Sequence, residues 1–536
     1  MKKLPIALFT AACMLLSACS NAPTSDPKSK AAATTETSSK DTISMAIAND
    51  IGDVNAHLYS GDMVVQGMLF EGLVENTPEG PKPCLAERWE ISDDGKTYTF
   101  YLKKGVKFSD GEPMNAAAIK ANMDAIQANK EFHNWLELSN KIVSCDIVDE
   151  YTVNLVLSNP YYPTLEELGL TRPYHMMSPA TFINGATMDG VSDYVGTGAY
   201  KLEEYVEDQY AVFTANEEYH GGVPAIKKIT MKVMPAGETP LLAMMNGEIN
   251  FLFSTDTSGL VDADILRQLQ KDNKFQVQTS HPCSTRYLLT NSMKERTIAD
   301  KNIKQAVWYA INRQDMCSYV FSEFETPAQS IFARTVPYCD VDLPEREYSV
   351  DEAKSLIEKS AWVMDESTGY YTKEGKRLSL ELVYNSSLAI NKTTGEFIQA
   401  NLKDAGIDVI LVPSESTSVR QLRAAGNYDL YLDRSWGLPY DPQTTLTGLF
   451  GEIAYVSAAI DLECYDELHE LVNGALVEMD EEVRQEYYNK ILTIVHEESC
   501  FIPLSYSQAI IAAEKDLQGI SFNQTQLEVP FKKFHY

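Results

Sequence analysis

The sequence predicts an α/β fold with more than one domain, and three observations support this prediction. The chain has 536 residues, which is too long for one hydrophobic core. Its composition, 44% hydrophobic and 23% charged, is typical of a soluble globular body. Strand-like and helix-like segments alternate along the whole body without an internal repeat, and this order is typical of α/β domains.

Each element follows from its periodicity and its turn residues. The segments that alternate polar and apolar residues, and therefore predict strands, are 42–50, 89–114 (two strands joined at Asp94-Gly95), 142–160 (a hairpin around Asp149-Glu150), 227–235 and 378–385. The segments with apolar residues at helical spacing, which predict helices, are 63–75, 115–126, 239–251 (ending at a glycine before a strand), 302–316 and 395–413 (continuing into a strand). Asn115 is the expected N-cap of the second helix.

The first forty residues predict export and a lipid anchor. A basic start is followed by an apolar run that is too short to span a bilayer comfortably, and then by Leu16-Ser17-Ala18-Cys19, which resembles a bacterial lipobox. We expect a signal peptide over 1–18, lipidation of Cys19, and a flexible tether over 19–40, which lacks large apolar side chains. The alternative is an ordinary signal peptide with a chance cysteine.

Charge and cysteine usage exclude two classes of protein. A formal net charge of −31 repels nucleic acid, so no nucleic-acid partner is expected. The seven cysteines after Cys19 are scattered and form no CxxC pair, which argues against a zinc site or a disulfide scaffold. We expect single buried thiols, with one long-range disulfide left open as an alternative.

Three segments together resemble a known family. They are WEISDDGKTYTFYLKKGVKFSDGEPMNA (89–116), VGTGAYKLEEYVEDQYAVFTANEEYHGGVPAIKKITMKVMP (195–235) and SWGLPYDP (435–442). With the lipobox, they are similar to the solute-binding proteins of ABC importers in the peptide and nickel cluster, family 5. The resemblance implies a two-lobed periplasmic-binding-protein-like fold of class II, large cluster C type, with strands that cross between the lobes as a hinge. The implied lobes are 41–281 (with an inserted subdomain at about 88–195) plus 508–536 for lobe I, and 282–507 for lobe II.

Within this cluster, the chain is most similar to the nickel and metal-chelate branch. The segments are HLYSGDM (57–63), HNWLELSNKIV (133–143), YYPTLEELGLTRPYHMMSP (161–179) and LEVPFKKF (527–534). The resemblance implies that Arg172 binds chelator carboxylates, because a guanidinium forks onto a carboxylate through two parallel hydrogen bonds. The implied pocket residues beside it are Trp135, Trp436, Tyr440, Met63, Tyr59 and Ser60.

The chain departs from the pattern of this branch at two positions. The branch often carries an arginine before the histidine of HNWLEL, where this chain has Phe132, and a metal-binding histidine in a loop where residues 443–460 contain none. Arg420 or Arg434 would replace the missing cation. We expect no resident cofactor and no protein metal site, since the chelator supplies the metal ligands. His57 and His133 remain candidate metal ligands, against the commoner structural role of a lone histidine.

The expected function is capture of a small solute, most simply a nickel or other metal chelate, in a cleft between the lobes, with delivery to an ABC permease and ATPase. The protein is expected to be a lipid-anchored extracytoplasmic monomer. The alternative solute is an oligopeptide or dipeptide. An exported enzyme is disfavoured because the sequence contains no GxSxG, HExxH or Walker motif. A sensor or adhesin with the same binding fold is not separated from a transport receptor by the sequence.

Overall fold

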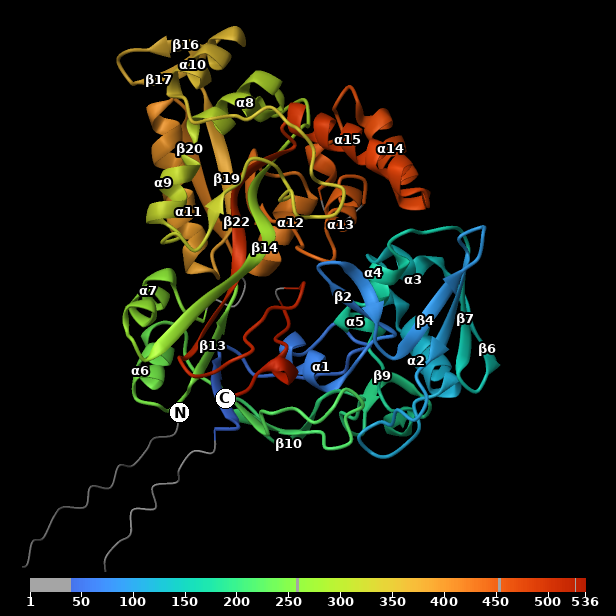
Figure 1. Ribbon diagram of the computed structural model, residues 1–536. Coiled ribbons are helices and arrows are strands. Elements are labelled where there is room, and N and C mark those ends of the chain that lie inside the picture. The colour runs from blue at the N-terminus through green and yellow to red at the C-terminus, as the bar shows by residue number, and fades with distance from the viewer. Residues whose placement is uncertain (1–39, 257–259, 452–454, 526) are drawn as a thin grey trace, which may run out of the picture. The chain divides into compact units, whose positions relative to one another are not determined.

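The computed structural model describes residues 40–256, 260–451, 455–525 and 527–536 (Figure 1). The predicted signal peptide and Cys19 lie outside these residues. Within them, the predicted α/β class is confirmed, and none of the helices combines the length and apolar character that a bilayer span needs. We keep the names lobe I (residues 41–281 and 508–536) and lobe II (residues 282–507) for the two predicted parts.

Eleven strands in the described part of the chain form one mixed sheet in the order β10-β11-β12-β1-β13-β22-β14-β21-β19-β20, with β15 paired to β22. Their bounds are β10 Tyr200–Val206, β11 Tyr210–Ala215, β12 Lys228–Val233, β1 Thr42–Ile47, β13 Phe251–Ser254, β22 Phe501–Glu514, β14 Phe275–Thr290, β21 Leu430–Arg434, β19 Ser379–Asn385, β20 Asp408–Ser414 and β15 Thr326–Pro327. The predicted strands at 42–50, 227–235 and 378–385 are β1, β12 and β19.

Two long antiparallel strands, β14 and β22, connect the two halves of this sheet (Figure 1). One end of β22 pairs with β13 of lobe I, and the opposite end of β14 pairs with β21 of lobe II. Their ladder shifts register between Thr279 and Ser284, around the pair Pro282↔Gln508. A bulged ladder bends more easily than a regular one, and this pair lies where the sequence predicted the chain to cross between lobes.

A smaller sheet, β4-β5-β7-β6, forms within the inserted segment. Its strands are β4 Ala86–Ile91, β5 Thr97–Leu102, β7 Thr152–Leu157 and β6 Ile142–Asp149, and helix α2 (Ala116–Ala128) contacts β6 and β7. Asn115 caps α2 as predicted, because its side chain accepts from the Ala118 amide at 3.0 Å. The sheet and α2 share one apolar core that includes Tyr98, Phe100 and Ile119.

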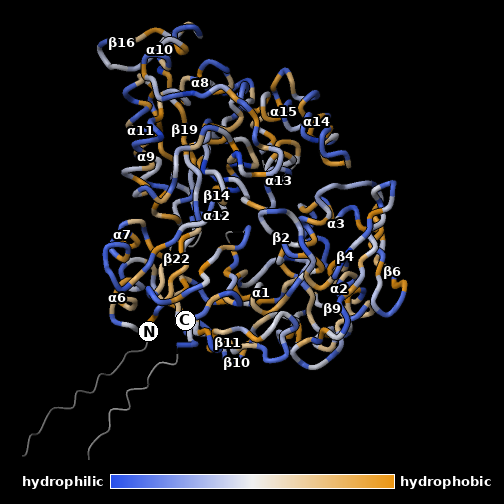
Figure 2. The backbone as a smooth tube through the Cα atoms, viewed as in Figure 1, coloured by the Kyte–Doolittle hydropathy of each residue, from blue (hydrophilic) through white to orange (hydrophobic). Residues whose placement is uncertain are grey.

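Further apolar cores lie on both sides of the crossing strands. In lobe I, β1, β12 and β13 pack against the returning C-terminus. In lobe II, one core surrounds β19, α8 (Lys301–Ala310) and α11 (Ala389–Asp404), and another joins α14 (Tyr465–Val477) to α15 (Glu481–Glu497). Figure 2 shows hydrophobic stretches along the central strands such as β22, whose residues are mostly buried. These cores are centred in different lobes, and the core of the inserted sheet also takes in Tyr440 and Leu476 of lobe II.

The remaining described helices have the following bounds: α1 Met63–Leu69, α3 Glu137–Lys141, α4 Thr164–Leu168, α5 Thr171–Tyr174, α6 Glu238–Met245, α7 Ala263–Lys271, α9 Arg313–Tyr319, α10 Val350–Lys359, α12 Ser416–Ala424 and α13 Gln443–Thr447. The short two- and three-stranded sheets use β2 Val74–Thr77 with β3 Gly80–Pro83, β8 Phe182–Ile183 with β9 Ala186–Val191, and β16 Val363–Asp365, β17 Tyr370–Lys373 and β18 Lys376–Arg377.

The predicted bounds of two helices were wrong. The single helix expected over 302–316 is two helices, α8 and α9, because Asn312 caps α9 by accepting from the Asp315 amide and so offers the backbone an alternative to continuing α8. The helix expected over 63–75 ends at Leu69. Phe70 adopts an extended conformation there, and the chain enters strand β2 at Val74.

Candidate functional site

A cavity of about 800 Å³ lies between lobe I and lobe II. Its lobe I wall is formed mainly by residues 45–49 and 61–64 with Arg172, and its lobe II wall mainly by α12 and residues 431–436. The volume falls within the range of small-molecule sites, roughly 300–1,000 Å³. Arg172, Tyr59, Met63, Trp436, Tyr440 and Arg420, all predicted from the sequence, line it.

Arg172 is held in the cavity wall by neutral acceptors. Its Nε donates to Gln66 Oε1 at 2.8 Å, and one terminal nitrogen donates to the Gly61 carbonyl at 2.8 Å. Gly61 has a φ of +77°, and a Cβ there would lie 2.2 Å from the Asp53 carbonyl, so only glycine fits. No described carboxylate lies within 4.0 Å of the guanidinium. Burial lowers the pKa of Arg172, opposed by nearby Tyr59, Tyr440 and Asp62, and the group keeps a charge that its neighbours do not neutralise.

Four rings, Tyr59, Trp135, Trp436 and Tyr440, gather beside Arg172; we call them the aromatic cluster. Trp135 of lobe I stacks on Trp436 of lobe II with ring centroids 5.0 Å apart and planes 14° apart. Tyr440 lies 5.9 Å from Trp135, and Tyr59 meets Trp135 edge-on at 5.6 Å. The Arg172 guanidinium carbon lies 5.2 Å from the centre of the Tyr59 ring. Trp135 does not itself line the cavity. It contacts Tyr59, Trp436 and Tyr440, which do.

Loop 435–442 presents Trp436 because its own backbone is tied down. The buried Asp441 carboxylate accepts from the Gly437 amide at 2.8 Å and from the Thr445 hydroxyl at 2.6 Å. Gly437 has a φ of +80°, and a Cβ there would lie 2.7 Å from the Cys283 carbonyl. The Ser435 amide also donates to the Thr285 carbonyl of β14 at 2.8 Å. Trp436 is thus fixed to the crossing strand, while its indole stays 40% exposed.

The remaining arginines that line the cavity are paired with carboxylates, with one exception. Arg286 pairs with Glu325 at 2.9 Å, and Arg423 pairs with Asp433 at 3.0 Å. Arg434 pairs with Asp256 at 3.3 Å. Arg420 on α12 is exposed, and its Nε donates to the Ser416 carbonyl at 3.1 Å. Of the two replacements proposed for the missing cation, Arg420 is therefore the one not bonded to an acid.

The other predicted site residues are placed away from the cavity. Ser60 donates through its hydroxyl to the Asp53 carbonyl at 3.0 Å, which stabilises its own loop. His133 bonds the His57 carbonyl through Nε2 at 2.7 Å, and His57 Nδ1 lies 3.2 Å from the Thr187 hydroxyl. Both rings are fully buried, and burial lowers the pKa of His133 and brings that of His57 to about 3.

Both histidines are buried and hydrogen-bonded within the protein, as is typical of structural residues. Neither ring lines the cavity, and no group of three or more potential metal ligands occurs in the described parts of the chain. All seven described cysteines are free, and six of them are buried. Among the described residues, the cavity wall thus offers a guanidinium and ring faces to a ligand.

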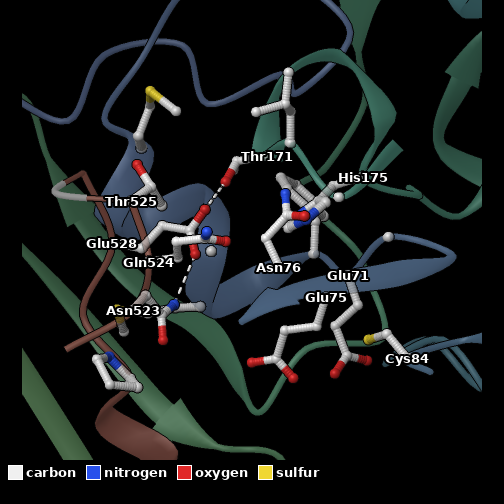
Figure 3. Close-up of a pocket in the computed structure, with 18 of the residues that line it drawn as sticks. Glu71, Glu75, Asn76, Cys84, Thr171, His175, Asn523, Gln524, Thr525 and Glu528 are labelled. Atoms are coloured by element: carbon white, nitrogen blue, oxygen red, sulfur yellow. Dashed lines mark hydrogen bonds between the residues drawn. The ribbon is translucent and has the colours of Figure 1, made fainter. Parts of the chain in front are cut away.

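A smaller pocket of about 60 Å³ adjoins the cavity, since Met63 and Tyr440 line both. Figure 3 shows this smaller pocket. Glu528 sits at its centre, hydrogen-bonded to the Thr171 hydroxyl and to Asn523 Nδ2, the latter at 2.7 Å. Burial raises the pKa of Glu528. Since Thr171 directly precedes Arg172, this carboxyl fixes the segment that carries the cavity arginine.

Sequence reasoning missed the residues that hold the site in place. Asp441 and Glu528 lie within segments quoted for their family resemblance, and Gln66 lies in the helix predicted over 63–75, but each acts by bonding a neighbour rather than by facing the cavity. Only Asp441 carried a local signal, since an aspartate between turn residues commonly bonds nearby backbone amides.

Comparisons with known proteins agree with this geometry. The model for "Bacterial extracellular solute-binding proteins, family 5 Middle" matches residues 80–455. The nickel-binding periplasmic protein of Escherichia coli (strain K12) is 34% identical over 496 residues, covering 92% of this chain and 94% of that protein. NikA from Brucella suis, solved in complex with Fe(III)-EDTA, matches with a TM-score of 0.89 at 35% identity, over 92% of this chain and 99% of that one. The dipeptide-binding protein of Escherichia coli (strain K12) is 22% identical over 460 residues, covering 82% of this chain and 83% of that protein.

The family match covers most of the body, and the first relative is aligned over nearly its full length. The sequence resemblance, the α/β architecture and the interlobe cavity all agree with it. The chain belongs to family 5 of the bacterial extracellular solute-binding proteins.

Proposed function

We propose that this protein captures a metal chelate, such as a nickel–amino acid complex, in the interlobe cavity and delivers it to an ABC importer. Proteins of this family bind small ligands outside the cytoplasm and work with an ABC permease and ATPase. The observation that carries the choice of ligand is Arg172, a cation held by neutral acceptors beside four rings.

The chemistry of a chelate fits these groups. A metal–amino acid complex has a carboxylate rim, which Arg172 binds, and flat apolar faces, which the aromatic cluster covers. A charged hydrogen bond of this kind contributes about 1.5–3 kcal/mol in a closed site. The chelator supplies the metal ligands, because no histidine lines the described cavity wall.

Ligand binding and closure are coupled through the two walls. Arg172 and Arg420 lie on opposite lobes, and each lacks a carboxylate partner among the described residues. A ligand with two anionic groups engages both only when the lobes are closed, so it binds the closed state better than the open one, as closure requires. The bulged crossing of β14 and β22 serves as the hinge.

The finer features of the proposal follow from the sequence. Cys19 carries the lipid anchor, residues 20–40 form the tether, and the body works as a monomer on the outer side of the membrane. A peptide is the second candidate ligand, because a cavity of about 800 Å³ is larger than a bis-amino-acid complex needs. Of the three acids that line that cavity among the described residues, Asp256 and Asp433 are paired with arginines and Asp62 caps α1, which leaves them less available to a peptide amino group.

Isothermal titration calorimetry with the purified protein tests the proposal. Nickel with L-histidine is expected to bind, nickel alone to give little heat, and a series of dipeptides to pentapeptides to give none. Nickel with histamine, which lacks the carboxylate, is the matched control and is expected to bind more weakly. Binding of peptides together with no response to nickel–histidine would overturn the chelate in favour of the peptide.

A further inference from the structure

A second contact between the lobes lies outside the cavity. It joins the segment around α4 of lobe I to residues of lobe II, and we call the five residues Tyr162, Glu166, Tyr338, Arg484 and Tyr488 the clasp. None of the five is among the residues that line the interlobe cavity. Their role is therefore separate from direct contact with a ligand.

Tyr162 is the centre of the clasp. Its hydroxyl lies 2.8 Å from the hydroxyl of Tyr488 on α15, and its ring meets that of Tyr338 edge-on at 5.8 Å. Its amide donates to the carbonyl of Leu476, the penultimate residue of α14, at 3.0 Å. Tyr338 in turn stacks on Tyr488 at 5.3 Å with planes 13° apart. A lobe I residue is thus inserted into a lobe II aromatic group.

Arg484 on α15 covers the same ring. Its guanidinium carbon lies 4.0 Å from the centre of the Tyr162 ring and 4.9 Å from that of Tyr338. One terminal nitrogen donates to the Tyr338 hydroxyl at 2.9 Å, whereas its buried Nε has no partner among the described residues. A cation over aromatic faces contributes most when water is excluded.

Glu166 lies beside these groups with one carboxyl oxygen, Oε2, fully covered and without a hydrogen-bond partner in the described chain. Burial raises the pKa of Glu166 to about 7, helped by Glu481 and opposed by Arg484. The titratable and charged groups that face it from all packed elements are Tyr98, Tyr162, Glu167, Tyr338, Glu481 and Arg484. A carboxylate oxygen that is covered and unpaired is costly when charged, so the neutral form of this partly buried group is favoured.

The clasp joins two cores. Tyr161, which precedes Tyr162, packs in the core of the inserted sheet, whereas Tyr162 itself packs with Tyr338 and Tyr488 against the core of α14 and α15. Rotation of one lobe about the crossing at Pro282 and Gln508 would separate them and return Glu166 to water.

We propose that the clasp latches the closed receptor and that closure favours the protonated form of Glu166, whose proton comes from solvent. This inference rests on the proposed function, because it needs a cleft that opens. Because the closed state binds the proton more tightly than the open state, acid favours closure and alkali favours opening. Between about pH 5.5 and about pH 8.5, the ratio of closed to open receptor is expected to fall about tenfold or more.

Pulsed EPR distances on the ligand-free protein test the clasp. Nitroxides at Val148→Cys and Glu486→Cys, in a Cys464→Ser background, report the separation of the lobes from two exposed positions. The wild-type background is expected to shift from short to long distances as the pH rises. Glu166→Gln is expected to stay largely closed at both pH values, while Tyr162→Phe is more open at both and keeps its pH dependence.

The exposed Glu131→Gln is the matched control and is expected to behave as the wild-type background. Distances that do not change with pH, whether all short or all long, would overturn the clasp, as would full pH dependence in Glu166→Gln or an unchanged distribution in Tyr162→Phe. Titration of the same labelled protein with nickel–histidine separates the two proposals. Binding with pH-independent distances rejects the clasp alone, whereas pH-dependent closure without binding rejects only the chelate.

Discussion

Apart from Arg420, the arginines on the lobe II wall of the cavity are held in the opposite way to Arg172 on the lobe I wall. On the lobe I wall, Arg172 bonds only neutral acceptors, Gln66 and the Gly61 carbonyl. On the opposite side, Arg286, Arg423 and Arg434 each pair with a carboxylate at 2.9–3.3 Å. A guanidinium held by neutral groups is oriented without being neutralised, so its charge remains available to a ligand. One paired with an acid contributes to the structure instead.

The largest effect is expected where a buried pair is broken. Arg286→Gln leaves Glu325 without its cation, and the free energy of unfolding is expected to fall by about 3–5 kcal/mol. Chemical denaturation followed by circular dichroism measures this change. The exposed pair of Arg377 with Asp408 gives the control, since Arg377→Gln is expected to cost less than about 1 kcal/mol. Equal losses in the two variants would contradict the assignment of Arg286 to structure.

Arg172→Gln is expected to show the reverse pattern. Affinity for nickel–histidine should fall by about 1.5–3 kcal/mol, because the lost bond is made to a charged ligand group, while the unfolding free energy changes little. Calorimetry and denaturation of the same variant separate the two quantities. Arg267→Gln on α7, outside the cavity, is the control. A variant that loses stability but retains affinity would remove Arg172 from the binding site.

His57 resembles Arg172 in having neutral hydrogen-bond partners, but it does not line the cavity. Its folded pKa of about 3 lies below the ordinary value of 6.5, so its contribution to stability is present above pH 6.5 and is lost as the pH falls towards 3. Between about pH 7 and pH 5, this histidine is expected to account for a loss of about 2 kcal/mol.

Denaturation at several pH values tests this expectation. His57→Gln should flatten the acid limb of the stability curve, whereas the exposed His281→Gln should leave it unchanged. An unaltered slope in His57→Gln would mean that the ring is not kept neutral by burial.

Arg420→Gln is expected to have the smallest effect. The side chain is exposed on α12, so its contribution to nickel–histidine affinity should be about 0.2–1 kcal/mol and should shrink as salt is added. Calorimetry at low and high ionic strength checks both points. A loss as large as that of Arg172→Gln would show that the two walls contribute equally to binding.

Prediction from sequence succeeded where local pattern decides. The strands at residues 42–50 and 227–235, the hairpin at 142–160 and the Asn115 cap all rest on periodicity or turn chemistry. The helix over 302–316 failed because apolar spacing continues across Asn312, and only its side-chain bond to the Asp315 amide ends one helix and starts another.

The sequence by itself determined the α/β class and the family resemblance, and it pointed to arginines and several rings as the residue types of the site. Only the tertiary structure decided which arginines remain unpaired by acids, which histidines are buried, and that Trp135 stacks on Trp436 from the opposite lobe. The physical reason is distance along the chain. Periodicity and turn propensity act over a few residues, whereas pairing and burial depend on segments that folding brings together from hundreds of residues apart.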